Sequence, residues 1–199
     1  MYDKIYKQVF EKRGEEVNMV FRNSELNGTG EIVVYSNYHP YWNNRETRER
    51  NPRFDVFSGK LLDLKEGKPS AIEYFFDILD KEINPGVTIC VVPSSDADNT
   101  DSGIAKLALA LANSNRKDMV YYLQRKKSIP KLAHGGYRGK EVHYQSIETV
   151  KDMDITGDIV LLMDDITTSG NSLYACKNIL IESGADTVEM FALGKTVRD

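Results

Sequence analysis

The sequence is poor in the residues and patterns that define several protein classes. Its 199 residues include two cysteines, Cys90 and Cys176, and no CxxC pair, so no disulfide framework is expected and both thiols are expected in the core. No apolar run is long enough to span a bilayer, and the opening MYDKIYKQVFEKRGEE lacks the apolar core of a signal peptide. We therefore expect a soluble cytoplasmic protein.

Charge and glycine patterns exclude two further classes. The formal net charge is −4, which argues against a protein that coats nucleic acid generally. No GxGxxG follows an early strand, which excludes a Rossmann-type dinucleotide enzyme. The chain is 41% hydrophobic and 28% charged, a balance that predicts an ordinary buried core rather than disorder.

The chain divides into two regions of different character. Residues 1–68 form an irregular N-terminal extension, or hood, whose β-like pieces at 31–36 and 54–64 flank an arginine-rich stretch. Residues 69–199 are regular and form the predicted core domain. The expected order there is a helix at 72–79, a strand at 87–92, a helix at 104–113, strands at 119–123 and 158–163, a helix ending at Gly184 and a strand at 187–193.

This alternation of strands and helices predicts an α/β fold with a mainly parallel sheet and helices on both faces. Ligands of such sheets bind beyond the carboxyl ends of the strands. That rule selects two loops, 93–103 and 164–172.

The second loop has the more specific pattern. In LLMDDITTSGNSL (161–173), an apolar strand ends in two carboxylates, and hydroxyls and a glycine lead into a helix. Backbone N–H groups at a helix start have no intrahelical partner, and they attract anions together with the helix dipole. The loop is therefore a candidate phosphate site, while the two acids need another target, such as the vicinal hydroxyls of a ribose or a metal-bound water.

These residues resemble the 5-phosphoribosyl-1-pyrophosphate (PRPP) motif of type I phosphoribosyltransferases, and the chain looks closest to the ComF-like competence-associated branch. The resemblance covers about residues 69–197, and residues 1–68 match no family pattern. It implies a Mg²⁺-dependent transferase in which a nitrogen nucleophile displaces pyrophosphate from PRPP. The implied catalytic acids are Asp164 and Asp165, and the implied phosphate-binding residues are Thr167, Thr168, Ser169, Gly170, Asn171 and Ser172.

The resemblance also assigns a role to the loop after the first core strand. In the family this loop binds pyrophosphate, which implies phosphate contacts for Ser94 and Ser95. The loop has no lysine or arginine, unlike common family members, and carries Asp96, Asp98 and Asp101 instead. We expect Asp96 to help Asp164 and Asp165 hold Mg²⁺, because hard oxygen ligands suit that ion. A solvated acidic loop with helix-capping aspartates is the equal alternative.

A basic segment, Arg125 to Lys140, is the candidate for the mobile hood that family members close over the site. It contains six lysines or arginines and no acid between Met119 and Lys140, and its glycines would permit opening and closing. Arg125, Lys131 and Arg138 are the expected catalytic cations. A basic surface loop is the alternative, and His134 and His143 are candidate proton carriers.

The acceptor stays open. Purine-salvage relatives place an aspartate where this chain has Thr168, which argues against a hypoxanthine or guanine acceptor. A second function is a PRPP- or nucleotide-sensing protein without transferase activity, associated with nucleic-acid metabolism. The aromatics of 35–42 would then stack on a single strand, although packing onto the core is favoured. Relatives often form dimers, so a homodimer is an open expectation.

Overall fold

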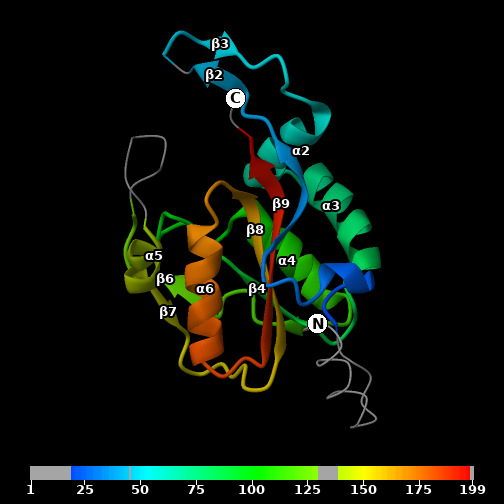
Figure 1. Ribbon diagram of the computed structural model, residues 1–199, viewed down its shortest axis with the longest axis vertical. Helices are drawn as coiled ribbons and strands as arrows, with labels where there is room; N and C mark the ends of the chain where they lie inside the picture. The colour runs from blue at the N-terminus through cyan, green and yellow to red at the C-terminus, as the bar shows by residue number, and fades with distance from the viewer. Residues whose placement is uncertain (1–18, 45, 130–138, 198–199) are drawn as a thin grey trace.

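The computed structural model describes residues 19–44, 46–129 and 139–197 (Figure 1). Its centre is a five-stranded sheet in the order β1-β9-β8-β4-β5, in which every neighbouring pair of strands is parallel. The strands are β1 (Ile32–Tyr38), β4 (Thr88–Val91), β5 (Lys117–Asp118), β8 (Ile159–Thr167) and β9 (Thr187–Thr196).

Strand β8 lies in the middle of this sheet and is apolar on both faces. Leu161 and Met163 belong to one buried cluster, whereas Val160 and Leu162 belong to another. Because successive residues of a strand point to opposite faces, the sheet divides the interior into two cores. A strand covered on both faces needs apolar residues throughout, which explains its continuous apolar run.

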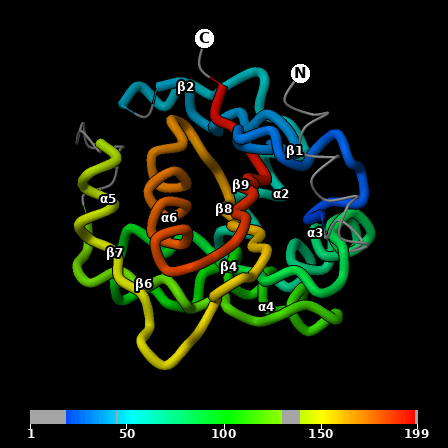
Figure 2. Tube along the Cα trace, turned by 60° about the horizontal axis from the view of Figure 1, so that its bottom comes forward, coloured from blue at the N-terminus to red at the C-terminus, as the bar shows by residue number. Residues whose placement is uncertain are grey.

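Helices cover both faces of the sheet (Figures 1 and 2). The first core receives Leu61, Phe75 and Leu107 from three helices. These are α2 (Val56–Lys65), α3 (Pro69–Glu82) and α4 (Gly103–Asn113). The second core is closed by α6 (Asn171–Glu182) through Leu173, Cys176 and Leu180. The predicted fold class, a parallel sheet with helices on both faces, is confirmed.

Smaller elements surround this centre. Helix α5 (Lys140–Ser146) lies beside α6, next to the antiparallel pair β6 (Leu123–Arg125) and β7 (Ile147–Thr149) (Figure 2). A second antiparallel pair, β2 (Trp42–Asn44) and β3 (Glu49–Arg50), and a short 3-10 helix, η2 (Ser24–Leu26), belong to the N-terminal region.

The N-terminal region contributes a strand and a helix to the central layers. The predicted strand at 31–36 is β1, which pairs with β9 at the edge of the sheet. The β-like interpretation of 54–64 is wrong, because this segment contains α2. Asp55 caps its first turn by accepting the Ser58 N–H at 2.7 Å. Phe57, Leu61 and Leu64 follow at helical spacing and pack on the first core, so the helical period overrides the short alternation.

Two other boundaries differ from the sequence prediction. The strand predicted at 119–123 is wrong, because pairing with β4 ends at Asp118 and a turn follows, in which the Tyr122 N–H donates to the Met119 carbonyl at 3.0 Å. Strand β9 continues past Leu193 to Thr196, since Gly194 pairs with Ser36 of β1 and Ile166 of β8.

The aromatic side chains of the N-terminal region pack on one another. Tyr41 makes edge contacts with Trp42 and Phe54, with ring centroids 4.6 and 5.0 Å apart. Tyr35 stacks on Phe57 at 5.7 Å. These contacts are the packing interpretation that the sequence favoured over a stacking surface for nucleic acid.

The strand order also locates a binding edge. From β4 the chain passes through α4 to β5 on one side, whereas β8 lies on the other side of β4. The carboxyl ends of β4 and β8 therefore flank the point at which the strand order reverses, where open α/β sheets bind ligands. Within the described ranges, no helix combines the length and apolarity that crossing a membrane requires.

Candidate active site

A cavity of about 220 Å³ opens at this reversal point. Its walls come from the loop after β4, the end of β8, the start of α6 and the last residue of α2. Most of the predicted site residues line it: Ser94, Ser95, Arg125, Asp164, Asp165, Thr167, Thr168, Ser169, Gly170 and Ser172. The two loops selected from the sequence therefore meet at one cavity.

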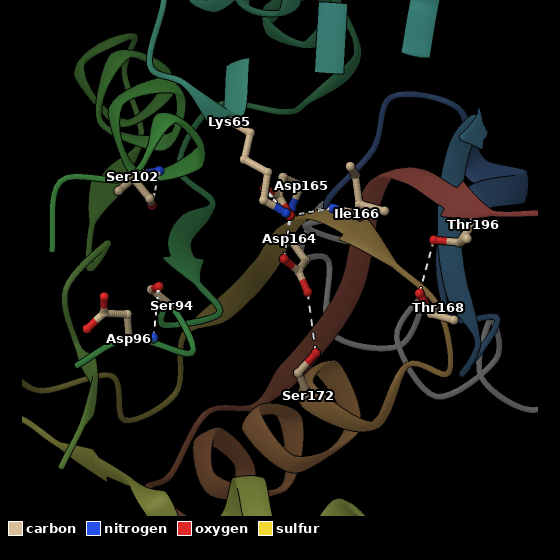
Figure 3. A network of polar contacts seen from close by, with 11 residues as sticks. Lys65, Ser94, Asp96, Ser102, Asp164, Asp165, Ile166, Thr168, Ser172 and Thr196 are labelled. Atoms are coloured by element: carbon tan, nitrogen blue, oxygen red, sulfur yellow. Dashed lines mark hydrogen bonds and ion pairs between the residues drawn. The ribbon is translucent and has the colours of Figure 1, made fainter. Parts of the chain in front are cut away.

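The two carboxylates lie within β8 and point in different directions (Figure 3). Asp164 faces α6 and accepts a hydrogen bond from the Ser172 hydroxyl at 3.4 Å. Asp165 faces α2, where its Oδ2 lies 3.5 Å from the Lys65 ammonium. Because strand residues alternate, two adjacent acids can present one carboxylate toward each wall of the cavity.

The pKa values of Asp164 and Lys65 are both shifted in this site. Burial, and secondarily the neighbouring Asp165, raise the pKa of Asp164 well above its usual range. Asp165 raises the pKa of Lys65, so this lysine stays charged. The Asp165 N–H donates to Asp164 Oδ1 at 2.9 Å, and the Ile166 N–H donates to Asp165 Oδ1 at 2.6 Å. Both carboxylates are therefore held in fixed orientations.

The start of α6 faces the cavity, and its first N–H, that of Asn171, donates to the Ser169 hydroxyl at 3.5 Å. Gly170 is the N-cap residue with φ +78°, and no side chain caps the helix. The positive φ favours glycine, and a Cβ at Gly170 would in addition lie 2.5 Å from Ile32 Cδ1, so the end of that side chain would have to shift. The first N–H groups of a helix have no partner within the helix, and together with the positive end of the helix dipole they favour an anion.

The hydroxyls of this loop are not equivalent. Thr168 donates to Thr196 at 3.0 Å, and Ser172 is engaged with Asp164. Thr167 is 4% exposed and its Oγ1 has no hydrogen-bond partner among the described residues. A buried hydroxyl without a partner costs free energy on the order of 1–3 kcal/mol, so a ligand atom is the physical explanation that fits a cavity wall.

The loop after β4 is held from behind by Arg125. This side chain is 8% exposed and donates to the carbonyl oxygens of Pro93 and Ser94 and to the Ser146 hydroxyl. The Ile129 N–H also donates to the Ser95 carbonyl at 2.9 Å. These bonds fix the Pro93–Ser95 carbonyls toward β6 and α5, and they place Arg125 in a supporting position beside the cavity.

The residues expected to hold Mg²⁺ are not brought together as a set of three. Asp96 accepts the Asp98 N–H at 3.2 Å and the Ser128 hydroxyl at 3.3 Å, and it lines a neighbouring cavity. In the described part of the chain, no group of three His, Cys, Asp or Glu residues could hold a metal ion. Asp164 and Asp165 fit a cation only in combination with oxygen atoms of a bound ligand.

Several residues complete the comparison with the sequence prediction. Asn171 begins α6, and the buried His143 lines the cavity. Lys131, Arg138 and His134 lie outside the described residues, so their predicted roles stay predictions. Lys65 was not predicted: no motif marks it, and it directly follows the segment 54–64 that was interpreted as β-like.

Comparisons with known proteins add a structural likeness. No family model and no curated protein matches the chain. A solved hypoxanthine phosphoribosyltransferase from Staphylococcus aureus is 14% identical, with a TM-score of 0.40 over 70% of this chain and 75% of its own. One from Trypanosoma cruzi is 14% identical, with a TM-score of 0.38 over 75% and 82% of the two chains. At these values the fold class rests on the sheet itself, and the function rests on the site.

Proposed function

We propose that the protein binds PRPP in this cavity and is a phosphoribosyltransferase of the type I family. The observation that carries the proposal is the buried Thr167 hydroxyl beside the uncapped start of α6. Both face a cavity that also contains two carboxylates. Phosphate donors next to carboxylates match the two ends of a phosphorylated ribose, with its anionic phosphate and its vicinal hydroxyls.

In the proposed complex, each wall has a separate task. The 5-phosphate accepts hydrogen bonds from the Thr167 hydroxyl and the N–H groups at the start of α6. Asp164 and Asp165 face the ribose, where they orient its hydroxyls and stabilise the positive charge that develops at the anomeric carbon. Ser94 and Ser95 face the pyrophosphate from the opposite wall.

The proposed reaction exchanges one bond at the anomeric carbon. A bond from this carbon to the acceptor nitrogen forms, while the bond to the pyrophosphate oxygen breaks and pyrophosphate leaves with the bonding electrons. The acceptor nitrogen then loses its extra proton to solvent. Mg²⁺, held by Asp164 or Asp165 together with ligand oxygens, would supply charge neutralisation for the leaving group.

The acceptor and the family branch are finer proposals. Thr168 donates to Thr196 and presents no carboxylate, which supports an amine, a pyrimidine or another base rather than hypoxanthine or guanine. We retain the ComF-like branch as the proposed relationship, supported by the order of motif and elements. The second candidate function, a PRPP sensor, is favoured by the loop after β4, whose acids stand where catalytic relatives often have a cation.

Pyrophosphate release tests these alternatives. The protein is mixed with PRPP and Mg²⁺, and release is followed against a panel of bases and amines, with Asp165→Asn as the matched variant. Release with one acceptor, lost in Asp165→Asn, supports the transferase. Binding of PRPP without release supports the sensor. Absence of PRPP binding, with no change in melting temperature, contradicts both.

A further inference from the structure

Lys65 places a cation from the N-terminal region in the cavity. It is the last residue of α2, and its side chain lines the cavity although 59% of it is exposed. Among the described residues it pairs with Asp165, whose Oδ2 lies 3.5 Å away and whose side chain is 16% exposed. Because the lysine end of this pair is accessible to solvent, the ammonium can exchange the carboxylate for a ligand oxygen that accepts the same hydrogen bond.

The acid pair in the cavity would repel an anionic ligand, and Lys65 is placed to offset this repulsion. The described lysine, arginine and carboxylic side chains that line the cavity are Lys65, Arg125, Asp164 and Asp165. Arg125 directs its guanidinium at the carbonyls of Pro93 and Ser94 and at Ser146. A ligand with a phosphate and a diphosphate would approach two carboxylates, and like charges a few ångströms apart repel strongly in a partly buried site. Lys65 is the described cation positioned over those carboxylates.

The packing of α2 directs Lys65 toward one end of the cavity. An ideal Cβ at Gly103 would lie 1.6 Å from the Leu64 carbonyl oxygen, so the end of α2 packs directly on the backbone at the start of α4. Gly103 directly follows the loop after β4. In Figure 3, Lys65 and Ser102 lie on one side of the acid pair and Ser172 on the opposite side. Lys65 is therefore across the acid pair from Ser172, at the start of α6, where the 5-phosphate is proposed to bind.

Given the ligand proposed above, we propose that Lys65 is a specificity residue that leaves Asp165 on binding and contacts the 1-diphosphate. In the ligand-free protein, the Lys65–Asp165 ion pair offsets the negative charge of the acid pair. When the ion pair opens, Asp165 can bind the ribose hydroxyls. The N-terminal region thereby contributes a side chain that distinguishes a ribose 5-phosphate with a diphosphate from one without it.

Two ligands and three variants test this assignment. Binding of PRPP and of ribose 5-phosphate, each with MgCl₂, is measured by titration calorimetry for the intact chain and for Lys65→Gln, Lys65→Arg and Lys68→Gln. Lys68 is the matched control, because it is exposed and pairs with Asp63 and Glu66 instead of reaching the cavity. Melting temperatures accompany each titration.

We expect Lys65→Gln to weaken PRPP binding about tenfold and to change ribose 5-phosphate binding by less than about twofold. Lys65→Arg is expected to restore most of the PRPP affinity, and Lys68→Gln to change neither. Equal weakening of both ligands by Lys65→Gln would indicate a structural effect and overturn the assignment, as would unchanged PRPP binding. If the unaltered protein binds neither ligand, the proposed function itself fails. This outcome is distinct from failure of the Lys65 assignment, which is judged from the variants of a protein that binds PRPP.

Discussion

The two loops that line the cavity achieve their shape in different ways. The loop after β8 is shaped by its own residues: Gly170 adopts a left-handed conformation, and the helix behind it has no side-chain cap. The loop after β4 is shaped by other elements, since Arg125 of β6 and Ser128 bind its backbone. One loop leads directly into a helix start that faces the cavity, and the other is held in place by a buried arginine.

This difference explains which part of the site the sequence could reveal. The loop after β8 combines strand, acid pair, hydroxyls and helix within thirteen residues, so its function is visible as a local pattern. Arg125, which the sequence analysis expected to be a catalytic cation, donates to carbonyl oxygens about thirty positions away, and no local pattern indicates these contacts. Each way of shaping a loop predicts a different response to mutation.

The largest effect is expected at Gly170 in the loop after β8, because its backbone adopts a left-handed conformation that favours glycine. Gly170→Ala places a Cβ at positive φ and 2.5 Å from Ile32 Cδ1. We expect a loss of about 1–3 kcal/mol of stability and of 100-fold or more in ribose 5-phosphate affinity, measured by denaturant unfolding and calorimetry. Gly157→Ala is the control, because it also has positive φ but meets no atom within 4 Å. Equal affinity losses in the two variants would contradict the account.

A substitution of Arg125 tests how the loop after β4 is held in place. Arg125→Met removes the donors to Pro93, Ser94 and Ser146 while keeping most of the apolar volume. Since truncating a buried charged partner leaves its acceptors unsatisfied, we expect a loss of roughly 2–4 kcal/mol of stability. We also expect PRPP affinity to fall more than ribose 5-phosphate affinity, by about tenfold in their ratio. A fall that is equal for both ligands would show that the loop after β4 does not face the diphosphate.

A substitution of Thr167, at the end of β8, is expected to affect stability and ligand binding in opposite directions. Thr167→Val removes a buried hydroxyl that has no partner within the described residues, at nearly constant volume. We expect stability to stay equal or to rise by up to about 1 kcal/mol, while ribose 5-phosphate affinity falls about tenfold. Thr167→Ser should keep both values near those of the unaltered protein. A stability loss in Thr167→Val with unchanged affinity would remove the hydroxyl from the binding site.

The smallest expected effect concerns the pH dependence of stability. The pKa of Asp164 is raised in the folded protein, first by burial and then by Asp165. The folded state thus favours the protonated carboxyl, and its stability falls as pH rises from the unfolded pKa through the folded pKa. Asp164→Asn should therefore raise the melting temperature at pH 7 by about 2–4 °C and have less effect near pH 4. Scanning calorimetry at both pH values checks this, and a larger gain at pH 4 would contradict the assigned shift.

Much of the fold could be predicted from the sequence, and the exceptions have physical causes. The apolar strands β4 and β8 and the helices α3, α4 and α6 follow from local periodicity and capping. Segment 54–64 was misinterpreted because its Asp55 cap and helical spacing compete with short β-like alternation. The turn after Asp118 is closed by two local bonds, from the Val120 N–H to Asp118 Oδ1 and from the Tyr122 N–H to the Met119 carbonyl, which the apolar run at 119–123 outweighed in the sequence interpretation.

Part of the lining of the candidate site could also be predicted from the sequence. The residues near Thr167 and Asp165 lie in one continuous segment, so the sequence places them together. Lys65 reaches the cavity only because α2 packs on Gly103, a long-range contact that no local pattern reports. Asp96 was grouped with the acid pair by composition, whereas its Asx-type bonds and Ser128 direct it toward another cavity.

A crystal structure of the protein grown with PRPP and Mg²⁺ tests the central claim most directly. The account predicts that the 5-phosphate lies within hydrogen-bonding distance of the Thr167 hydroxyl and of the N–H groups at the start of α6. It also predicts ribose hydroxyls facing Asp164 and Asp165. A ligand bound with its 5-phosphate elsewhere, or an empty cavity at saturating PRPP, would contradict it.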